Sequence, residues 1–348
     1  MVATQKPSVP ASVASGHGDL GHGDMKTFHW MRRLVAGLVL CVLLAGAAIW
    51  FAGDLLIHPM PANVGPPPTD LPAHPVMFGS DSGSTIHGWF VPGQGTGAVL
   101  LLHGVRANRL SMLERARFLH RSGYSVLLID FQASGESPGR AITFGYLEAR
   151  DAEAAVAELR KLAPGQPIGL IGTSMGGAAA LLAQPRLQVD AIVLEQVYPT
   201  LAQALDDRLR LHAGVVGSWF EPLLAMTVEP HLGLSTQQMR PIDHIRALSV
   251  PKLLVAGSAD LHTTLDESLA MYRAAAIPKQ LWVVPGARHV DLDRYAGPAY
   301  RAHILAFLDT WLRHGAEPGS LHLSRPATAT VPHPFSPTAF GSTPGGAK

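Results

Sequence analysis

Cysteine is nearly absent from this sequence of 348 residues, in which Cys41 is the single example. An internal disulfide is therefore impossible, and a zinc site built from cysteine thiolates is excluded. Charge is also scarce, at 15% of residues, against about 25% in an average soluble domain. Lysine plus arginine (27) nearly equals aspartate plus glutamate (26), so the basic excess typical of a nucleic-acid binder is missing. Hydrophobic residues make up 47%, which excludes disorder throughout.

Charge is wholly lacking between Leu34 and Gly53. As a helix, these residues would rise about 1.5 Å each and span about 30 Å, the thickness of a bilayer's hydrocarbon core. Lys26, Arg32 and Arg33 precede the segment, and no lysine or arginine follows it until Arg106. By the positive-inside rule, the segment is a single membrane span with a cytoplasmic N-terminus and an extracytoplasmic domain.

Residues 34–53 also admit other interpretations. A cleaved signal peptide is the main alternative, with Ala45-Gly46-Ala47 as the cleavage site, although the arm before it is long for a signal peptide. A lipoprotein anchor at Cys41 is disfavoured because Leu40, rather than a small residue, precedes it. A buried core helix is disfavoured because the segment has no polar face. We therefore expect an uncleaved signal anchor.

The regions that flank the expected span and domain are poor in apolar periodicity. Residues 1–26 are predicted to be a disordered arm, and residues 315–348, rich in Pro, Ser, Thr and Gly, a disordered tail. Residues 54–75 contain seven prolines, which predict a stiff, extended linker between membrane and domain. The remaining block, residues 76–314, is expected to form one domain.

Short apolar runs alternate with amphipathic stretches in residues 76–314. This pattern predicts an α/β fold with a mostly parallel sheet covered by helices on both faces. An antiparallel edge hairpin is expected from the alternating runs 76–79 and 85–91. The expected buried strands are 98–102, 125–130, 168–172, 191–194, 252–256 and 280–284, and the expected helices include 112–119 and 148–162.

The strand at 168–172 ends in Gly172-Thr173-Ser174-Met175-Gly176, followed by a small-residue helix. Glycine two residues before and after a serine permits a very sharp strand-to-helix turn, which lifts the serine hydroxyl clear of the sheet. The helix N-terminus favours negative charge there. Ser174 is the predicted nucleophile.

A serine nucleophile needs a base and a group that orients the base. His289 follows the last expected strand and Asp260 follows the strand before it, so the order is Ser174, Asp260, His289. Glu195, at the end of another strand, and Asp291 are the alternative acids. The alternative bases are His87, His103 and His262. His103 is instead expected to make hydrogen bonds within its loop.

An oxyanion needs two backbone N–H donors. The residue after the nucleophile, Met175, supplies one. The loop His103-Gly104-Val105 follows the strand 98–102, and the N–H of Val105 is the expected second donor. No metal and no cofactor are implied.

These stretches give the chain a family resemblance over about two thirds of its length. Residues 76–314 resemble an α/β-hydrolase, and the layout is similar to the monoacylglycerol-lipase and serine-aminopeptidase-like branches and to membrane-anchored bacterial members. The resemblance assigns the family's roles to Ser174, Asp260, His289, Met175 and Val105. The loop 131–137 departs from the Arg-Gly-His-Gly often found there, so the pocket shape is expected to differ. The stretches that carry the resemblance are LLLHGVRANR, GYSVLLIDFQASGES, GLIGTSMGG, LLVAGSAD and GARH.

Residues 196–245 lie where the family commonly inserts a lid, which would line an apolar pocket or simply pack on the core. The leading hypothesis is a membrane-tethered serine hydrolase of carboxylic esters, acting on a small-molecule or lipid-like ester and binding no nucleic acid. A peptidase or amidase is the alternative, and would need an acid such as Glu195 or Glu221 to recognise an amine. A thioesterase and a non-catalytic membrane scaffold are further alternatives.

Overall fold

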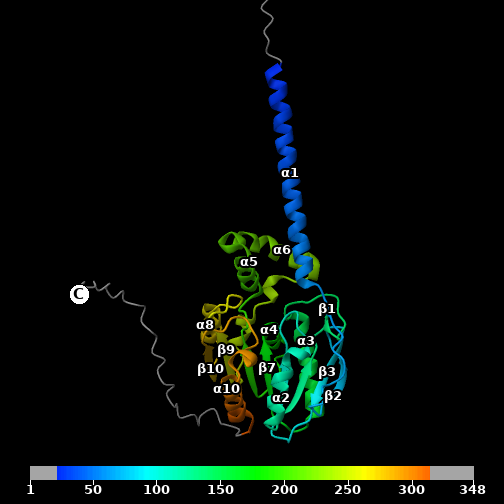
Figure 1. Ribbon diagram of the computed structural model, residues 1–348, viewed down its shortest axis with the longest axis vertical. Coiled ribbons are helices and arrows are strands. Elements are labelled where there is room, and N and C mark those ends of the chain that lie inside the picture. Colours follow the sequence, from blue (N-terminus) through cyan, green and yellow to red (C-terminus); the bar gives the residue numbers. More distant parts are fainter. Residues whose placement is uncertain (1–21, 314–348) are drawn as a thin grey trace, which may run out of the picture.

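The computed structural model describes residues 22–313, and the side chains of residues 28–313 (Figure 1). An eight-stranded sheet has the order β10-β9-β8-β7-β4-β5-β3-β2. Its strands are β2 (His74–Gly79), β3 (Thr85–Val91), β4 (Ala98–Leu102), β5 (Ser125–Ile129), β7 (Ile168–Thr173), β8 (Ala191–Glu195), β9 (Lys252–Gly257) and β10 (Lys279–Val284). β3 is antiparallel to both of its neighbours, and all other pairs among β4, β5 and β7–β10 are parallel. The predicted fold class is confirmed.

Side chains of the central strands alternate between two apolar cores. Leu100 and Leu102 of β4 face one core, and Val99 and Leu101 face the other. This alternation follows from the period of two in a strand, and it explains why the runs are apolar at every position. The first core is covered by α3 (Tyr146–Leu162), α4 (Met175–Leu182) and α8 (Leu265–Ala274), and the second by α2 (Leu113–Arg121), α9 (Leu292–Ala296) and α10 (Pro298–Leu308).

Residues 201–245, here called the insert, connect β8 to β9. They form α5 (Leu201–Gly217), α6 (Glu221–Leu232) and α7 (Pro241–Ile245), with short 3-10 turns at Ser218–Phe220 and Thr236–Gln238. Gly214, with φ 60° and ψ −152°, breaks the helical path of α5. Figure 1 shows α5 and α6 beside the lower end of α1 (His22–Ile57), which extends away from the domain.

α1 is longer than the predicted span of residues 34–53. Residues Phe28–Ile57 form an apolar helix with a mean hydropathy of 2.6 in its most apolar window, none of it buried. This helix could be a membrane span or a signal anchor. Its last turns pack on α6: the rings of Trp50 and His231 lie 4.1 Å apart between centroids. A side chain at Gly53 would collide with Thr227, at 2.3 Å, so glycine permits this close approach.

Part of residues 54–75, predicted to be a stiff, extended linker, is instead helical or paired with the domain. Residues 54–57 belong to α1, and Met60–Pro61 (β1) pair with Ser134–Gly135 (β6). Backbone N–H groups of Val64 and Gly65 donate to the Glu136 carboxylate at 3.3 and 3.2 Å. Hydrogen bonds therefore hold part of this region against the domain, although its prolines cannot donate. The arm expected at residues 1–26 lies mostly outside the described residues, and the tail expected at 315–348 lies wholly outside them.

Candidate active site

The turn between β7 and α4 places Ser174 in strained backbone geometry, with φ 50° and ψ −115°. A Cβ at Gly172 would lie 2.7 Å from the backbone of Gly177, and one at Gly176 would lie 2.4 Å from the Leu102 carbonyl oxygen. Only glycine fits at either position, which is the steric reason for the Gly-x-Ser-x-Gly spacing. The Ser174 N–H donates to the carbonyl of Glu195 at 2.8 Å, which holds the turn against β8.

His289 and Asp260 follow the carboxyl ends of β10 and β9. The Nδ1 of His289 lies 2.8 Å from Oδ2 of Asp260. Oδ1 of Asp260 accepts from the backbone N–H groups of His262 and Thr263, at 2.8 and 3.0 Å. Burial opposes ionisation of Asp260, but these hydrogen bonds, that of His289 foremost, hold its pKa below the usual value. A carboxylate at this place fixes Nδ1 as the donor and leaves Nε2 as an acceptor.

A cavity of about 60 Å³ brings most of the predicted residues together, since Ser174, Met175, Val105 and His289 all line it. Asp260 lies behind His289. Met175 is the first residue of α4, so its N–H has no acceptor within the helix. A second cavity of about 340 Å³ shares Ser174, Val105 and His289 with the first. The geometry brings together one hydroxyl, one imidazole and two candidate N–H donors.

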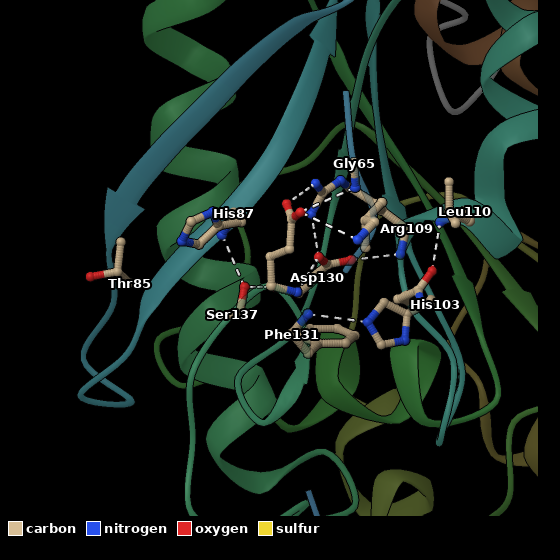
Figure 2. Close-up of polar contacts among 12 residues, drawn as sticks. Gly65, Thr85, His87, His103, Arg109, Leu110, Asp130, Phe131 and Ser137 are labelled. Atoms are coloured by element: carbon tan, nitrogen blue, oxygen red, sulfur yellow. Dashed lines mark hydrogen bonds and ion pairs between the residues drawn. The ribbon is translucent and has the colours of Figure 1, made fainter. Parts of the chain in front are cut away.

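His103 holds the loop that carries Val105. Its Nε2 accepts from the N–H of Phe131 at 3.1 Å (Figure 2). Its Nδ1 lies 2.7 Å from the Gly104 carbonyl oxygen. With Nε2 accepting, Nδ1 must be the donor, so the ring is neutral; burial accordingly lowers the pKa of His103. Both ring nitrogens are hydrogen-bonded, Nδ1 to a carbonyl within the loop and Nε2 to the N–H of Phe131 beside it. His103 is therefore not free to act as a base.

The loop 131–137, which departs from the family pattern, is held by a partly buried ion-pair network (Figure 2). Arg109 forms ion pairs with Asp130 and Glu136, and its backbone N–H also donates to Asp130 at 2.7 Å. The N–H of Glu136 donates to Asp130 at 2.9 Å. Arg109 is the last residue of the segment that begins at Val105, and Asp130 directly follows β5. Their ion pair therefore fixes the position of that segment relative to β5.

The alternative acids have other partners. Glu195 is fully buried, forms an ion pair with Arg115 at 2.9 Å and accepts from Thr173 at 2.8 Å. Asp291 pairs with the same arginine at 2.8 Å and caps α9. The carboxylate that His289 contacts is that of Asp260. The geometry therefore favours Asp260 as the orienting acid.

The remaining alternative bases are also less well placed. His87 lies on β3 beside Ser137, to which its backbone N–H donates at 2.9 Å (Figure 2). His262 does line the first cavity, with its ring 5.2 Å from that of His289 between centroids. Burial, together with Arg208 and His289, lowers the pKa of His262 to about 4. His262 therefore stays neutral above that pH.

Two residues near the site carry no clear signal in the sequence. Gln196 follows β8, and its Nε2 donates to Oδ2 of Asp260 at 2.8 Å and to the Arg288 carbonyl at 2.7 Å, so it ties the acid to the loop that carries His289. Arg208, on α5, lines both cavities. The position of Gln196 directly after a strand end is the one feature that points to it. No local pattern marks Arg208.

Backbone strain gathers around the cavities. Among the described residues, five non-glycine residues have positive φ, and four of them line one cavity or the other: Arg106, Phe144, Ser174 and Gln196. Such conformations are costly for residues with a side chain and concentrate at functional sites. Within the described part of the chain, His, Cys, Asp and Glu side chains nowhere gather in groups of three that could hold a metal.

The eight-stranded sheet, with a serine on a strained turn after its fifth strand, defines the class of the α/β-hydrolases. The family described as serine aminopeptidase, S33, matches residues 93–224. The chain is 30% identical over 288 residues to the uncharacterized protein Rv2307c of Mycobacterium tuberculosis, covering 79% of this chain and 95% of the relative. The chain belongs to the α/β-hydrolase superfamily, and hydrolysis is the class of reaction that this membership supports.

Two further comparisons agree with this assignment. The uncharacterized protein YfhR of Escherichia coli K12 is 25% identical over 267 residues, which cover 73% of this chain and 86% of the relative. The structure is similar to that of the esterase Pf2001 of Pyrococcus furiosus, with a TM-score of 0.61, 22% identity, and coverage of 74% of this chain and 98% of that one. At that identity, the likeness shows the shared fold.

Proposed function

We propose that this protein is a membrane-tethered serine hydrolase that cleaves carboxylic esters through an acyl-enzyme. Ser174 attacks the acyl carbon while His289 takes its proton, and Asp260 orients His289 and stabilises its charged form. The N–H groups of Met175 and Val105 hold the oxyanion. His289 then protonates the leaving alcohol, and water releases the acid.

The observation that carries the proposal is the shared cavity of Ser174 and His289, with His289 bonded to Asp260 at 2.8 Å. A strained serine, a nearby imidazole and a buried carboxylate serve no evident packing purpose. Together they are the parts that nucleophilic acyl transfer requires. This combination also argues against a non-catalytic scaffold.

The chemistry of the cavity favours an ester over an aminoacyl amide. Apolar side chains of Leu56, Phe144 and Leu201 line the first cavity, and none of its described lining residues is an aspartate or a glutamate. Glu195 is fully buried in its ion pair with Arg115. Glu221, on α6, is absent from the lining of both cavities. Asp291 lines the second cavity but is paired with Arg115, so a substrate amine would lack the free acidic partner that an aminopeptidase needs.

A membrane location is supported by α1 and by the insert. Exposed apolar side chains gather on the insert: Val215, Trp219 and Met226 are 75%, 74% and 72% exposed. They lie on the elements beside the lower end of α1 (Figure 1). A span that ends there would bring these side chains to the membrane surface, where Trp is favoured. In this proposal the hydrolase domain, residues 76–314, is extracytoplasmic and the insert acts as its lid.

Labelling with a fluorophosphonate tests the nucleophile, since the reagent reacts with activated serines. We expect the wild-type chain to be labelled and Ser174→Ala to be unlabelled. Ser111→Ala is the matched control, because Ser111 lines the second cavity away from the strained turn. Folded wild-type protein that resists labelling would overturn the proposal. A series of p-nitrophenyl esters against aminoacyl amides then separates ester from amide hydrolysis.

Orientation is tested in whole cells with a membrane-impermeant maleimide. The variant Met77→Cys, in a Cys41→Ala background, places one thiol at a position that is 66% exposed on β2. We expect labelling of intact cells whose outer barrier is permeabilised. Labelling only after the inner membrane is broken would reverse the proposed orientation. Recovery of the full-length chain in the membrane fraction would exclude cleavage near Ala47.

A further inference from the structure

Two arginines face the cavity of Ser174. Arg106 follows the oxyanion-loop residue Val105, and Arg208 lies on α5 of the insert. Both line the first cavity together with Ser174 and His289, and Arg208 also lines the second. The proposed mechanism gives these two side chains no role, since they belong neither to the triad nor to the oxyanion donors.

In the described part of the chain, the first cavity has no carboxylate in its lining that could neutralise these two side chains. The lining of the first cavity includes no aspartate or glutamate, and Asp291 in the second is already paired with Arg115. Among the described residues, the Arg106 side chain donates to the neutral carbonyl of Leu55, and the Arg208 side chain makes no hydrogen bond or ion pair. By contrast, the fully buried guanidinium groups of Arg109 and Arg115 are both paired with carboxylates, whereas Arg208 is half-buried and Arg106 exposed.

Asp260 is near Arg208 but cannot serve as its partner. Oδ1 of Asp260 accepts from the N–H groups of His262 and Thr263, and Oδ2 receives Gln196 and His289. All the strong acceptor directions of this carboxylate are occupied. Burial and the nearby Arg106 lower the pKa of Arg208, although Asp260 opposes that effect. His262, whose pKa is about 4, adds no charge at neutral pH.

The backbone supports the same interpretation. Arg106 has φ 58°, a left-handed conformation that is uncommon for a residue with a long side chain. A half-buried guanidinium without a partner, such as that of Arg208, is costly, and two that face one cavity repel each other. An anion bound between them would relieve both costs, because guanidinium groups bind carboxylate and phosphate through two parallel hydrogen bonds.

We propose that Arg106 and Arg208 form an anion-binding subsite, so that the preferred substrate is an ester that also carries a carboxylate or a phosphate. This inference rests on the proposed hydrolase function and names its substrate class. The shared chemistry is an anionic oxygen group. Its source is either a soluble dicarboxylic monoester or the phosphate of a lysophospholipid.

Two matched substrate pairs separate these sources, with the full chain in detergent micelles. p-Nitrophenyl hexanoate is compared with the p-nitrophenyl monoester of adipic acid, in which a carboxylate replaces the terminal methyl group of the same six-carbon acyl chain. A monoacylglycerol is compared with the lysophosphatidic acid that has the same acyl chain. We expect kcat/KM to favour the anionic member of at least one pair by about 10-fold or more, and the pair concerned identifies the source.

The variants Arg208→Gln and Arg106→Gln test the subsite itself. Each is expected to lower the preference for the anionic member by about 10- to 100-fold, which is the range for a lost hydrogen bond to a charged group. Arg208→Lys should restore only part of it, because lysine keeps the charge without the planar fork. Arg210→Gln is the matched control on the same helix, since Arg210 pairs with Asp206 at 2.7 Å and lines neither cavity. Its preference should equal that of the wild type.

A second readout does not depend on ester turnover. Adipate or glycerol phosphate should slow fluorophosphonate labelling of Ser174 in the wild type, and this protection should be lost in Arg208→Gln. Equal hydrolysis of neutral and anionic esters, together with no slowing of labelling by either anion, would overturn the subsite proposal. The proposed hydrolase function would still stand. Equal losses on neutral and anionic esters in Arg208→Gln would also overturn it, since Arg208 would then act through folding or through Asp260. No labelling of folded wild type would overturn the hydrolase itself.

Discussion

The sheet buries its apolar side chains, whereas the insert leaves several of its own exposed. Every residue of β4 is buried, and its side chains enter two separate cores. On the insert, Trp219 and Met226 are more than 70% exposed, and Gly214 interrupts α5. The sheet thus provides the rigid positions at its strand ends that chemistry needs. The insert supplies side chains that line the first cavity or face solvent, so changes in the two regions should have different consequences.

The largest effect is expected at a strand end of the sheet. Asp260→Asn should lower kcat by about 10³- to 10⁴-fold, because an amide can present its N–H to Nδ1 of His289 and so favour the wrong tautomer. Ester hydrolysis at saturating substrate measures the loss. Asp266→Asn, an exposed position on α8, is the control and should retain activity. If Asp260→Asn kept full activity, a different acid would orient His289.

The next largest effect concerns stability. Leu101→Ala should lower the free energy of unfolding by about 2–5 kcal/mol, because Leu101 is fully buried in β4 between two neighbouring strands. Leu223→Ala on α6, where the side chain is 46% exposed, should cost well under half as much. Urea unfolding of both variants in the same detergent checks the difference. Equal losses would remove the contrast between sheet and insert.

A smaller effect is expected from the exposed face of the insert. Trp219→Ser should lower hydrolysis of a long-chain ester embedded in lipid vesicles by about 3- to 10-fold, because an indole ring is favoured at the membrane surface. Hydrolysis of a short, soluble ester should change little. Ile277→Ser is the control, since Ile277 is 80% exposed but precedes β10, outside the insert. Equal changes in the hydrolysis of both substrates would show that Trp219 contributes to folding rather than to membrane contact.

The smallest effect is a pH dependence. The pKa of His262 is about 4 in the folded chain, mainly through burial, against 6.5 for an ordinary histidine. Between these values the unfolded chain binds a proton that the folded chain does not, so stability falls as pH decreases from about 6.5 to 4. His262→Gln should make the unfolding midpoint less dependent on pH across this window. A slope unchanged from wild type would show that other groups dominate.

The strands and the candidate triad are predictable from the sequence for a physical reason. Strands buried on both faces read as uninterrupted apolar runs, and parallel strands bring their carboxyl ends to one edge. Because Ser174, Asp260 and His289 each follow such a run, their positions in the chain are enough to predict that they meet at that edge. The antiparallel hairpin at β2 and β3 is predictable from its alternation in the same way.

Contacts between distant polar residues are not predictable in this way. The ion pairs of Arg109 with Asp130 and Glu136 join positions about 20 to 30 apart, and no periodicity records them. The docking of residues 60–65 escapes prediction because proline content suggests extension but not what the extended chain will meet. Arg208 escapes it because a single arginine on an amphipathic helix usually faces solvent.

The side chain of Arg106 bonds to the carbonyl of Leu55, and Leu56 lines the cavity of Ser174. The last turn of the apolar N-terminal helix therefore forms part of the wall of the candidate active-site cavity. A soluble version of the enzyme that began after Ile57 would leave the Arg106 guanidinium without its backbone acceptor and the chamber open on one side. Such a fragment would report the chemistry of the triad but not the substrate selectivity of the whole protein.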